Sequence, residues 1–158
     1  MLILNQLGFK ADGLELETAF SAGAFSLNTN IVYSKEVITL NLGNPSAVGK
    51  TSDGVPKLRY TISPRYTMGN LTFGATLRGQ SSVYSNGDNV NTIDGHYIVN
   101  AFANYEIGNG LTASVNVNNL FDKLAPAGGG GFVGGSSTVF GAGVETGRTI
   151  SASIRYAF

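Results

Sequence analysis

The chain has 158 residues, the size of one domain, with a formal net charge of zero and only 13% charged residues. This balance offers no basic surface to a nucleic acid, and no apolar run approaches the length of a membrane helix. The absence of Cys excludes disulfides and thiolate metal sites and leaves the redox compartment undetermined. The 22 Gly and 7 Tyr favour alternating strands joined by turns and Gly-rich loops.

The first residues, Met1–Gln6, do not form a signal peptide. They lack a basic n-region, and their apolar run is too short for the hydrophobic segment of a leader. We therefore expect the chain to be the back part of a longer protein, or a form whose leader has been removed.

Three strands are predicted in the first half of the chain, because apolar and polar residues alternate there with a period of two. They span Gly13–Ala22, Phe25–Thr39 and Lys57–Met68. A long polar loop, Asn41–Pro56, separates the second from the third. Pro64 interrupts the third strand, so we expect a bulge or a missing ladder bond there.

Three further strands are predicted by the same alternation over Leu71–Tyr84, His96–Ile107 and Leu111–Phe121. Long loops follow the first and third of these, at Ser85–Gly95 and Asp122–Thr146. Short turns are predicted at three other connections along the chain: Gly23-Ala24, Gly69-Asn70 and Gly108-Asn109-Gly110.

The last strand, within Gly147–Phe158, alternates most strictly. Its apolar residues are Ile150, Ala152, Ile154, Tyr156 and Phe158, and its polar residues are Thr149, Ser151, Ser153 and Arg155. A strand of about ten residues suits a tilted crossing of a bilayer. A terminal aromatic strand is typical of a bacterial outer-membrane barrel, whose last strand closes the barrel. We interpret Tyr156 and Phe158 as a signal for the barrel assembly machinery.

The connections alternate between short and long, as in outer-membrane barrels with short periplasmic turns and long external loops. The sequence therefore predicts an all-β fold, an antiparallel up-and-down transmembrane β-barrel of about 7–8 strands in the bacterial outer membrane. Because such barrels have even strand numbers, either Met1–Phe9 adds an eighth strand or the sheet is open. An open edge in lipid is not viable, so we expect the isolated chain to aggregate unless it rearranges or finds a partner.

Nearly every charged residue falls in a loop or on the polar face of a strand, away from lipid. On those faces we predict lumen-lining side chains: Arg59, Arg65, Arg78, Glu106 and Arg155, with Glu15 and Glu17 on the first strand. The simpler interpretation is a solvated or mutually paired lumen. A more specific interpretation makes Arg59, Arg65 and Arg78 part of a path for an anionic ligand. It rests only on the prediction that the three side chains lie on the same face.

Several short motifs resemble TonB-dependent outer-membrane receptors. Val115–Lys123 (VNVNNLFDK) is similar to the penultimate-strand motif of that family, and the Gly-Arg-Thr start at Gly147 leads to a final Tyr-x-Phe. Further similar motifs are Gly13–Glu17 (GLELE), Val55-Pro56-Lys57 and Gly108–Thr112 (GNGLT). The resemblance covers essentially the whole chain and is most specific in its C-terminal third.

The resemblance implies a barrel of about 22 strands that encloses a plug, with a segment that contacts TonB. Residues 1–158 then represent the C-terminal part of the barrel, without the plug. The implied role of the parent is energy-coupled uptake of a scarce nutrient, such as a siderophore complex, cobalamin or a glycan. Its implied partners are the lipid bilayer, the assembly machinery and the rest of the barrel. The chain alone is not expected to transport.

Two other functions stay open at this point. One is a small self-contained or oligomeric outer-membrane barrel with a structural or passive-pore role. The other is a soluble β-sandwich that binds a ligand, which the lipid-type alternation of at least five strands and the terminal aromatic disfavour.

Other candidate sites have simpler explanations. Gly128–Gly131 and Gly134-Gly135 lack the Lys and Ser/Thr of a phosphate-binding loop, so we predict a flexible external loop. His96 has no neighbouring Cys or His and is predicted to begin a strand rather than bind a metal. One His and no Cys cannot build a catalytic nucleophile and base, so neither catalysis nor a cofactor is expected. Candidate turn residues are Asp88, Asp94 and Asp122, and candidate ligand-stacking aromatics in loops are Tyr84, Phe132 and Phe140.

Overall fold

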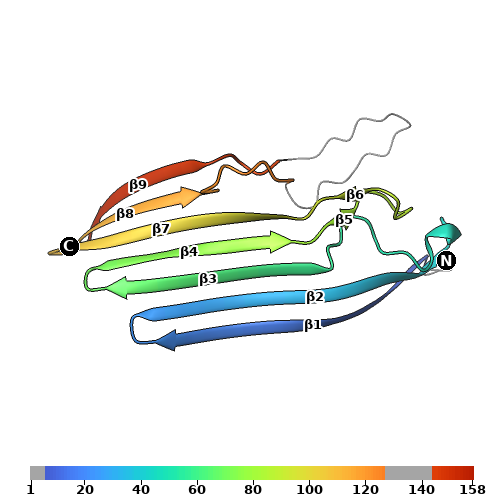
Figure 1. Ribbon diagram of the computed structural model, residues 1–158, viewed down its shortest axis with the longest axis horizontal. Coiled ribbons are helices and arrows are strands. Elements are labelled where there is room, and N and C mark those ends of the chain that lie inside the picture. Colours follow the sequence, from blue (N-terminus) through green and yellow to red (C-terminus); the bar gives the residue numbers. More distant parts are fainter. Residues whose placement is uncertain (1–5, 127–143) are drawn as a thin grey trace.

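The protein is built from antiparallel β-strands that follow one another in chain order, as its computed structural model shows (Figure 1). The structure describes residues 6–126 and 144–158. The elements are β1 (Leu7–Ala22), β2 (Phe25–Asn41), the 3-10 helix η1 (Pro45–Ala47), β3 (Leu58–Met68), β4 (Leu71–Gln80), β5 (Val83–Tyr84), β6 (Thr92–Ile93), β7 (His96–Gly108), β8 (Leu111–Asn118) and β9 (Thr149–Tyr156).

The main sheet has seven strands in the order β1-β2-β3-β4-β7-β8-β9, and every neighbouring pair is antiparallel. The tight turns lie at one end, together with the C-terminus, and the long connections lie at the opposite end (Figure 1). We call these the turn end and the loop end. The predicted up-and-down, all-β architecture is confirmed. In the described part of the chain, β1 and β9 form the two edges of an open sheet.

The first strand begins earlier than predicted, and this removes one option for an eighth strand. Gly8 and Phe9 pair with Leu40 and Ile38 as the start of β1, with a register shift between them. The idea that Met1–Phe9 forms a separate strand is therefore wrong for its residues 7–9, whereas residues 1–5 lie outside the described part.

The predicted strand Leu71–Tyr84 divides into two elements. β4 ends at Gln80, and Val83 and Tyr84 pair with Ile93 and Thr92 in a separate two-stranded sheet. The predicted loop Ser85–Gly95 therefore contains strand β6. The sequence Gln80-Ser81-Ser82 offers no apolar residue to continue the alternation, which explains the break.

Pro64 produces a gap in pairing without a bulge. On the β4 side, Ile62 pairs with Leu77 and Arg65 with Gly74, and the register is the same before and after the gap. Proline has no N–H to give to a ladder, so the pairing lapses locally while the strand continues. Of the two outcomes predicted at this position, the structure has the missing ladder bond.

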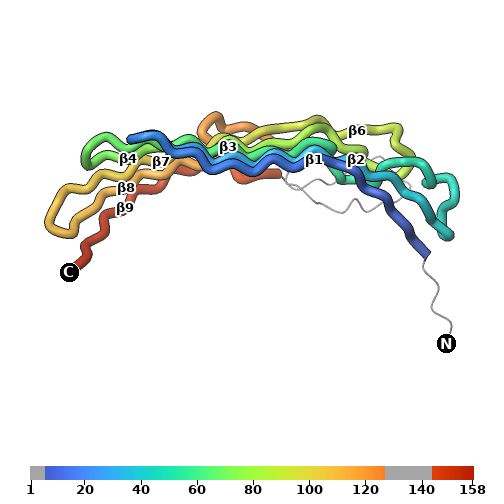
Figure 2. Tube along the Cα trace, turned by 90° about the horizontal axis from the view of Figure 1, so that it is seen from below, coloured from blue at the N-terminus to red at the C-terminus, as the bar shows by residue number. Residues whose placement is uncertain are grey.

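The sheet is a single arched layer, seen edge-on in Figure 2. In the described residues only five hydrophobic side chains are buried: Ile38, Ala47, Val83, Ile98 and Ala125. Large apolar side chains on one face remain exposed, including Leu14 at 79% and Ile154 at 73%. No helix within the described ranges is long and apolar enough to cross a membrane. A sheet with so little core depends on its surroundings to cover its apolar face.

Candidate functional site

Basic and amide side chains from neighbouring strands meet on the polar face near the loop end. In one row of the register, Arg59 of β3 is paired with Gln80 of β4, which is paired with His96 of β7. In the next row, Arg78 of β4 is paired with Thr61 of β3. Two successive rows therefore gather Arg59, Arg78 and His96, although 37 positions separate the first from the last in the sequence (96 − 59).

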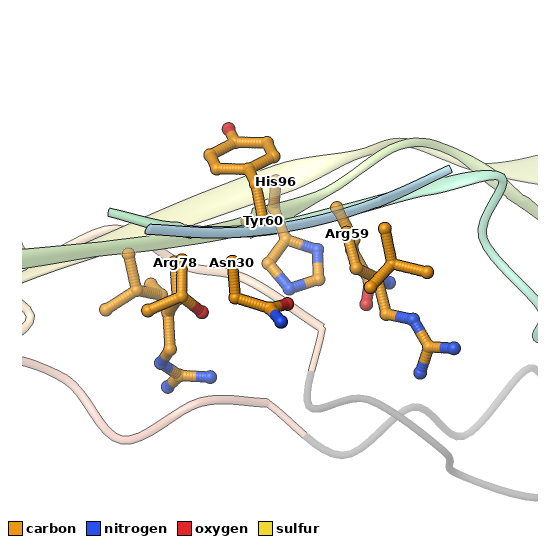
Figure 3. A pocket seen from close by; sticks show the side chains of 10 residues that line it. Asn30, Arg59, Tyr60, Arg78 and His96 are labelled. Atoms are coloured by element: carbon orange, nitrogen blue, oxygen red, sulfur yellow. The ribbon is translucent and has the colours of Figure 1, made fainter. Parts of the chain in front are cut away.

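These side chains border a hollow of about 380 Å³, which we call the polar-face site. Figure 3 shows four of its side chains projecting from one side of the sheet: Asn30, Arg59, Arg78 and His96. Tyr60 projects from the other side (Figure 3). The Nδ1 atom of His96 is buried and has no hydrogen-bond partner among the described residues. The lining is rich in N–H donors, which suits a ligand that carries oxygen acceptors.

Arg78 is held by a carboxylate from the segment before β9. Its Nη1 and Nη2 atoms donate to Oε1 and Oε2 of Glu145 at 3.1 and 2.9 Å. The hydrogen bond from Arg78 is the main cause that lowers the pKa of Glu145; burial opposes it, and the charges of Arg78 and His96 add to it. Because the pKa of Glu145 is lower in the folded state than in the unfolded state, the pair stabilises the fold at pH values above the unfolded-state pKa. This stabilisation is lost as the pH falls through the folded-state pKa.

The five predicted lumen residues share one face of the sheet but form two groups. Arg59 and Arg78 lie in the polar-face site at the loop end. Arg65, Glu106 and Arg155 lie nearer the turn end, where Thr112 is paired with Glu106 on one side and Arg155 on the other. No ion pair within 4.0 Å links Glu106 to Arg155 in the described structure.

Asn119 joins three parts of the chain at the end of β8, and the sequence analysis did not single it out. Its backbone N–H donates to Oδ1 of Asn100 in β7 at 2.9 Å. Its Nδ2 donates to the carbonyl oxygens of Lys123 at 3.0 Å and Thr146 at 3.1 Å, and its Oδ1 accepts from the Lys123 N–H at 2.8 Å. Asn119 is 3% exposed and has a φ of 50°, a left-handed conformation that asparagine tolerates. We call these contacts the Asn119 knot.

Two connections at the loop end, between β2 and β3 and between β5 and β6, are tied together by hydrogen bonds. The Thr51 N–H donates to Oδ1 of Asn89 at 2.8 Å, and Nδ2 of Asn89 donates back to the Thr51 carbonyl at 2.8 Å. Tyr84, predicted as a loop aromatic, is half-buried in β5 and accepts from Gly54 through its backbone. Several predicted features lie outside the described residues: Phe132, Phe140, Gly128–Gly131 and Gly134-Gly135.

The three predicted turn residues all lie in connections between strands. Asp122 has a φ of 52° and its Oδ1 accepts from the Arg148 N–H at 2.7 Å, so it helps to fix the start of β9. Asp88 and Asp94 lie in the connection between β4 and β7. Within the described ranges, no three His, Cys, Asp or Glu side chains are grouped to hold a metal ion.

The apolar face carries aromatic side chains at both ends. At the turn end three ring pairs lie 5.8–6.5 Å apart between centroids: Tyr66–Phe73, Tyr156–Phe158 and Phe20–Phe25. At the loop end Tyr33, Tyr60 and Tyr97 lie on the same face. From Tyr97 to Tyr105 the strand rises about 26 Å, which after tilting spans most of an apolar band of about 25 Å. The two groups match the aromatic girdles of outer-membrane barrels.

Comparison with known proteins agrees with this geometry. The family described as TonB dependent receptor-like, beta-barrel, matches residues 4–120. The Ferrioxamine B receptor of Salmonella typhimurium is 30% identical over 124 residues, which cover 72% of this chain and 17% of that receptor. The chain thus spans about a sixth of the length of the curated relatives it matches.

Solved structures show the same fold. The ferric yersiniabactin uptake receptor FyuA from Yersinia pestis superposes with a TM-score of 0.79 at 23% identity, over 98% of this chain and 24% of that one. The siderophore receptor PiuA from Acinetobacter baumannii superposes with a TM-score of 0.76 at 21% identity, over 94% and 22%. Together with the family match over most of the chain, these results show that the protein belongs to the TonB-dependent receptor-like β-barrel family of the outer membrane.

Proposed function

We propose that the chain supplies the C-terminal strands of an outer-membrane receptor that takes up an iron–siderophore complex by TonB-coupled transport. The observation that carries the proposal is the family match over residues 4–120. The similar proteins support the substrate class, since they include a ferrioxamine B receptor and several siderophore receptors.

The open sheet indicates which parts of the receptor this chain supplies in the proposal. Residues 1–158 are barrel, and a longer protein provides the plug, the TonB-contacting segment and the remaining strands. Unpaired edges such as those of β1 and β9 are not stable in hydrocarbon, because the free N–H and C=O groups have no water to bond. The chain alone is therefore not transport-competent in this proposal.

In the assembled barrel, the polar face lines the interior and the apolar face meets lipid. Arg or Lys on the lipid face costs about 2–4 kcal/mol near the bilayer midplane, which favours this orientation over the reverse. Five side chains then line the lumen: Arg59, Arg65, Arg78, Glu106 and Arg155. Tyr156 and Phe158 serve the barrel assembly machinery, which recognises the last strand before it pairs.

The polar-face site favours a substrate with exposed anionic groups. Arg59 and Arg78 offer planar guanidinium groups, and such groups match carboxylates and phosphates better than an ammonium does. The proposed role is binding and transport rather than catalysis.

Uptake of radiolabelled ferric citrate and ferrioxamine B tests the proposal in cells that express the full-length protein. We expect uptake of an iron complex to stop when an uncoupler abolishes the proton-motive force. Replacing both Arg59 and Arg78 by Gln is expected to weaken uptake of the anionic complex, whereas Lys10→Gln on the opposite face leaves it unchanged.

The passive-pore alternative makes the opposite prediction. A pore equilibrates small solutes without energy. Uptake would then persist in de-energised cells, and the double variant would reduce the uptake of unrelated solutes equally. These two results together would support a passive pore and contradict the receptor.

A further inference from the structure

We propose that Glu145 is an internal competitor for Arg78: its carboxylate occupies the oxyanion position of the polar-face site, and an incoming carboxylate or phosphate must displace it. The inference rests on the proposed function of this site as a binding surface for an anionic substrate. It adds a specific contact by which the chain regulates its own affinity.

The geometry of the pair is that of a bound ligand. Both carboxylate oxygens of Glu145 accept hydrogen bonds from two different nitrogens of Arg78, at 3.1 and 2.9 Å. This parallel arrangement is the one in which a guanidinium recognises a free carboxylate, so Glu145 satisfies the same donors that a substrate oxyanion needs.

The position of Glu145 is fixed by its backbone rather than by chance proximity. Its N–H donates to the Ala125 carbonyl at 2.8 Å, and the preceding Val144 forms a β-bridge with Pro126. The carbonyl oxygen of the following Thr146 accepts a hydrogen bond from Nδ2 of Asn119 at 3.1 Å, as part of the Asn119 knot. Contacts on both sides of Glu145 therefore hold its carboxylate over a strand that is 67 residues away in the sequence.

Among the described residues, Glu145 is the only carboxylate that forms an ion pair with a basic side chain of the site, whereas Glu15 accepts a hydrogen bond from Asn30 at 3.4 Å. Residues 1–5 and 127–143 contain no Asp, Glu, Lys or Arg, so every such side chain belongs to the described residues. Among them Arg78 pairs with Glu145, whereas Arg59 has no carboxylate within 4.0 Å. When Glu145 is displaced, two guanidinium groups become available together, beside the unpartnered Nδ1 of His96.

The size of the effect follows from exposure. The side chains of Arg78 and Glu145 are 46% and 23% exposed, so solvent screens their attraction. Such pairs are worth roughly 0.4–1 kcal/mol, which corresponds to a roughly two- to fivefold change in the affinity of a competing anion.

Calorimetric titration of citrate into the full-length protein, folded in detergent micelles, tests the competition. We expect Glu145→Gln to bind citrate two- to fivefold more tightly than the unmodified protein. Arg78→Gln is expected to bind at least tenfold more weakly, and the double variant should behave like Arg78→Gln. Glu145→Asp keeps the charge but shortens the side chain, so its gain should be smaller than that of Glu145→Gln.

Asp12→Asn is the matched control, because it also removes one carboxylate from an ion pair, with Lys10 at 3.2 Å, on the opposite face. It should leave citrate affinity unchanged, and far-ultraviolet circular dichroism should show equal β-content in all variants. The proposal is overturned if folded Glu145→Gln binds no more tightly than the unmodified protein, if Asp12→Asn gains as much, or if no variant binds citrate.

This result is independent of the transport test. Citrate competition without energy-dependent uptake would remove the proposed transport and keep the internal competitor. Energy-dependent uptake with no gain in Glu145→Gln would keep the receptor and remove the competitor.

Discussion

Gly110 lies against the backbone of Ala157, the residue before the C-terminus. A Cβ atom at position 110 would stand 2.1 Å from the Ala157 carbonyl oxygen, and Gly110 has a φ of 78°. The Ala157 N–H donates to the Gly110 carbonyl at 2.8 Å, just beyond the end of β9. Only glycine permits this approach, so the turn after β7 determines where the chain end can lie.

Replacing Gly110 by Ala should therefore release the last residues from β8. The left-handed φ and the backbone clash together are expected to cost about 1–3 kcal/mol of folding stability. Urea unfolding of the full-length protein in phospholipid vesicles, followed by circular dichroism, measures the loss. Gly87→Ala is the control, since nothing lies within 4 Å of a Cβ there. Equal losses for the two variants would contradict the role given to Gly110.

The Asn119 knot predicts that two adjacent asparagines differ strongly in importance. Asn119→Ala removes three side-chain hydrogen bonds at a site that is 3% exposed, and it is expected to cost about 2–4 kcal/mol. Asn118→Ala removes one exposed contact, to Thr149 at 3.3 Å, and should cost under about 1 kcal/mol. The same unfolding measurement compares them, and a larger loss for Asn118→Ala would show that the knot does not hold β8 to β9.

The sequence predicted the strands well where side chains alternate, because the period of two is a local property. It was less accurate where a strand extends beyond the apolar alternation, as at Lys10 and Asp12 in β1, which carry charges on the otherwise apolar face. β8 ends three residues before the predicted Phe121, because Asn119 adopts a left-handed conformation that residue type alone does not require.

The polar-face site was predicted only in part, for a similar reason. The alternation of each strand predicted that Arg59 and Arg78 lie on the polar face. Their proximity to His96 depends on the pairing register between strands, which cannot be read from the sequence of one strand. Glu145 was assigned to a loop, and its contact with Arg78 arises only when β9 pairs with β8. One signal was present: Glu145 is the single acidic residue after Asp122.

Phe158 is expected to matter for assembly rather than for stability or binding. It is fully exposed, and its ring lies 6.3 Å from that of Tyr156. Deleting Phe158 in the full-length protein should lower its outer-membrane level several-fold, while the molecules that do assemble keep their ligand affinity. Quantitative immunoblotting of membrane fractions and binding to intact cells separate the two effects. Normal membrane levels with lost binding would assign Phe158 to a ligand site.

The central claim is that the apolar face of this sheet contacts lipid and the polar face contacts water. Single cysteines test it directly, because the chain has none of its own. Val115 and Asn116 are adjacent in β8, as are Ser153 and Ile154 in β9, and all four side chains are exposed, so burial in the protein cannot explain different reactivities.

Each position is changed to Cys in the full-length protein, and outer membranes are treated with an aqueous or a lipophilic maleimide. We predict that Asn116→Cys and Ser153→Cys react with the aqueous reagent, whereas Val115→Cys and Ile154→Cys react only with the lipophilic one. Equal labelling of all four by the aqueous reagent would contradict the membrane-spanning account.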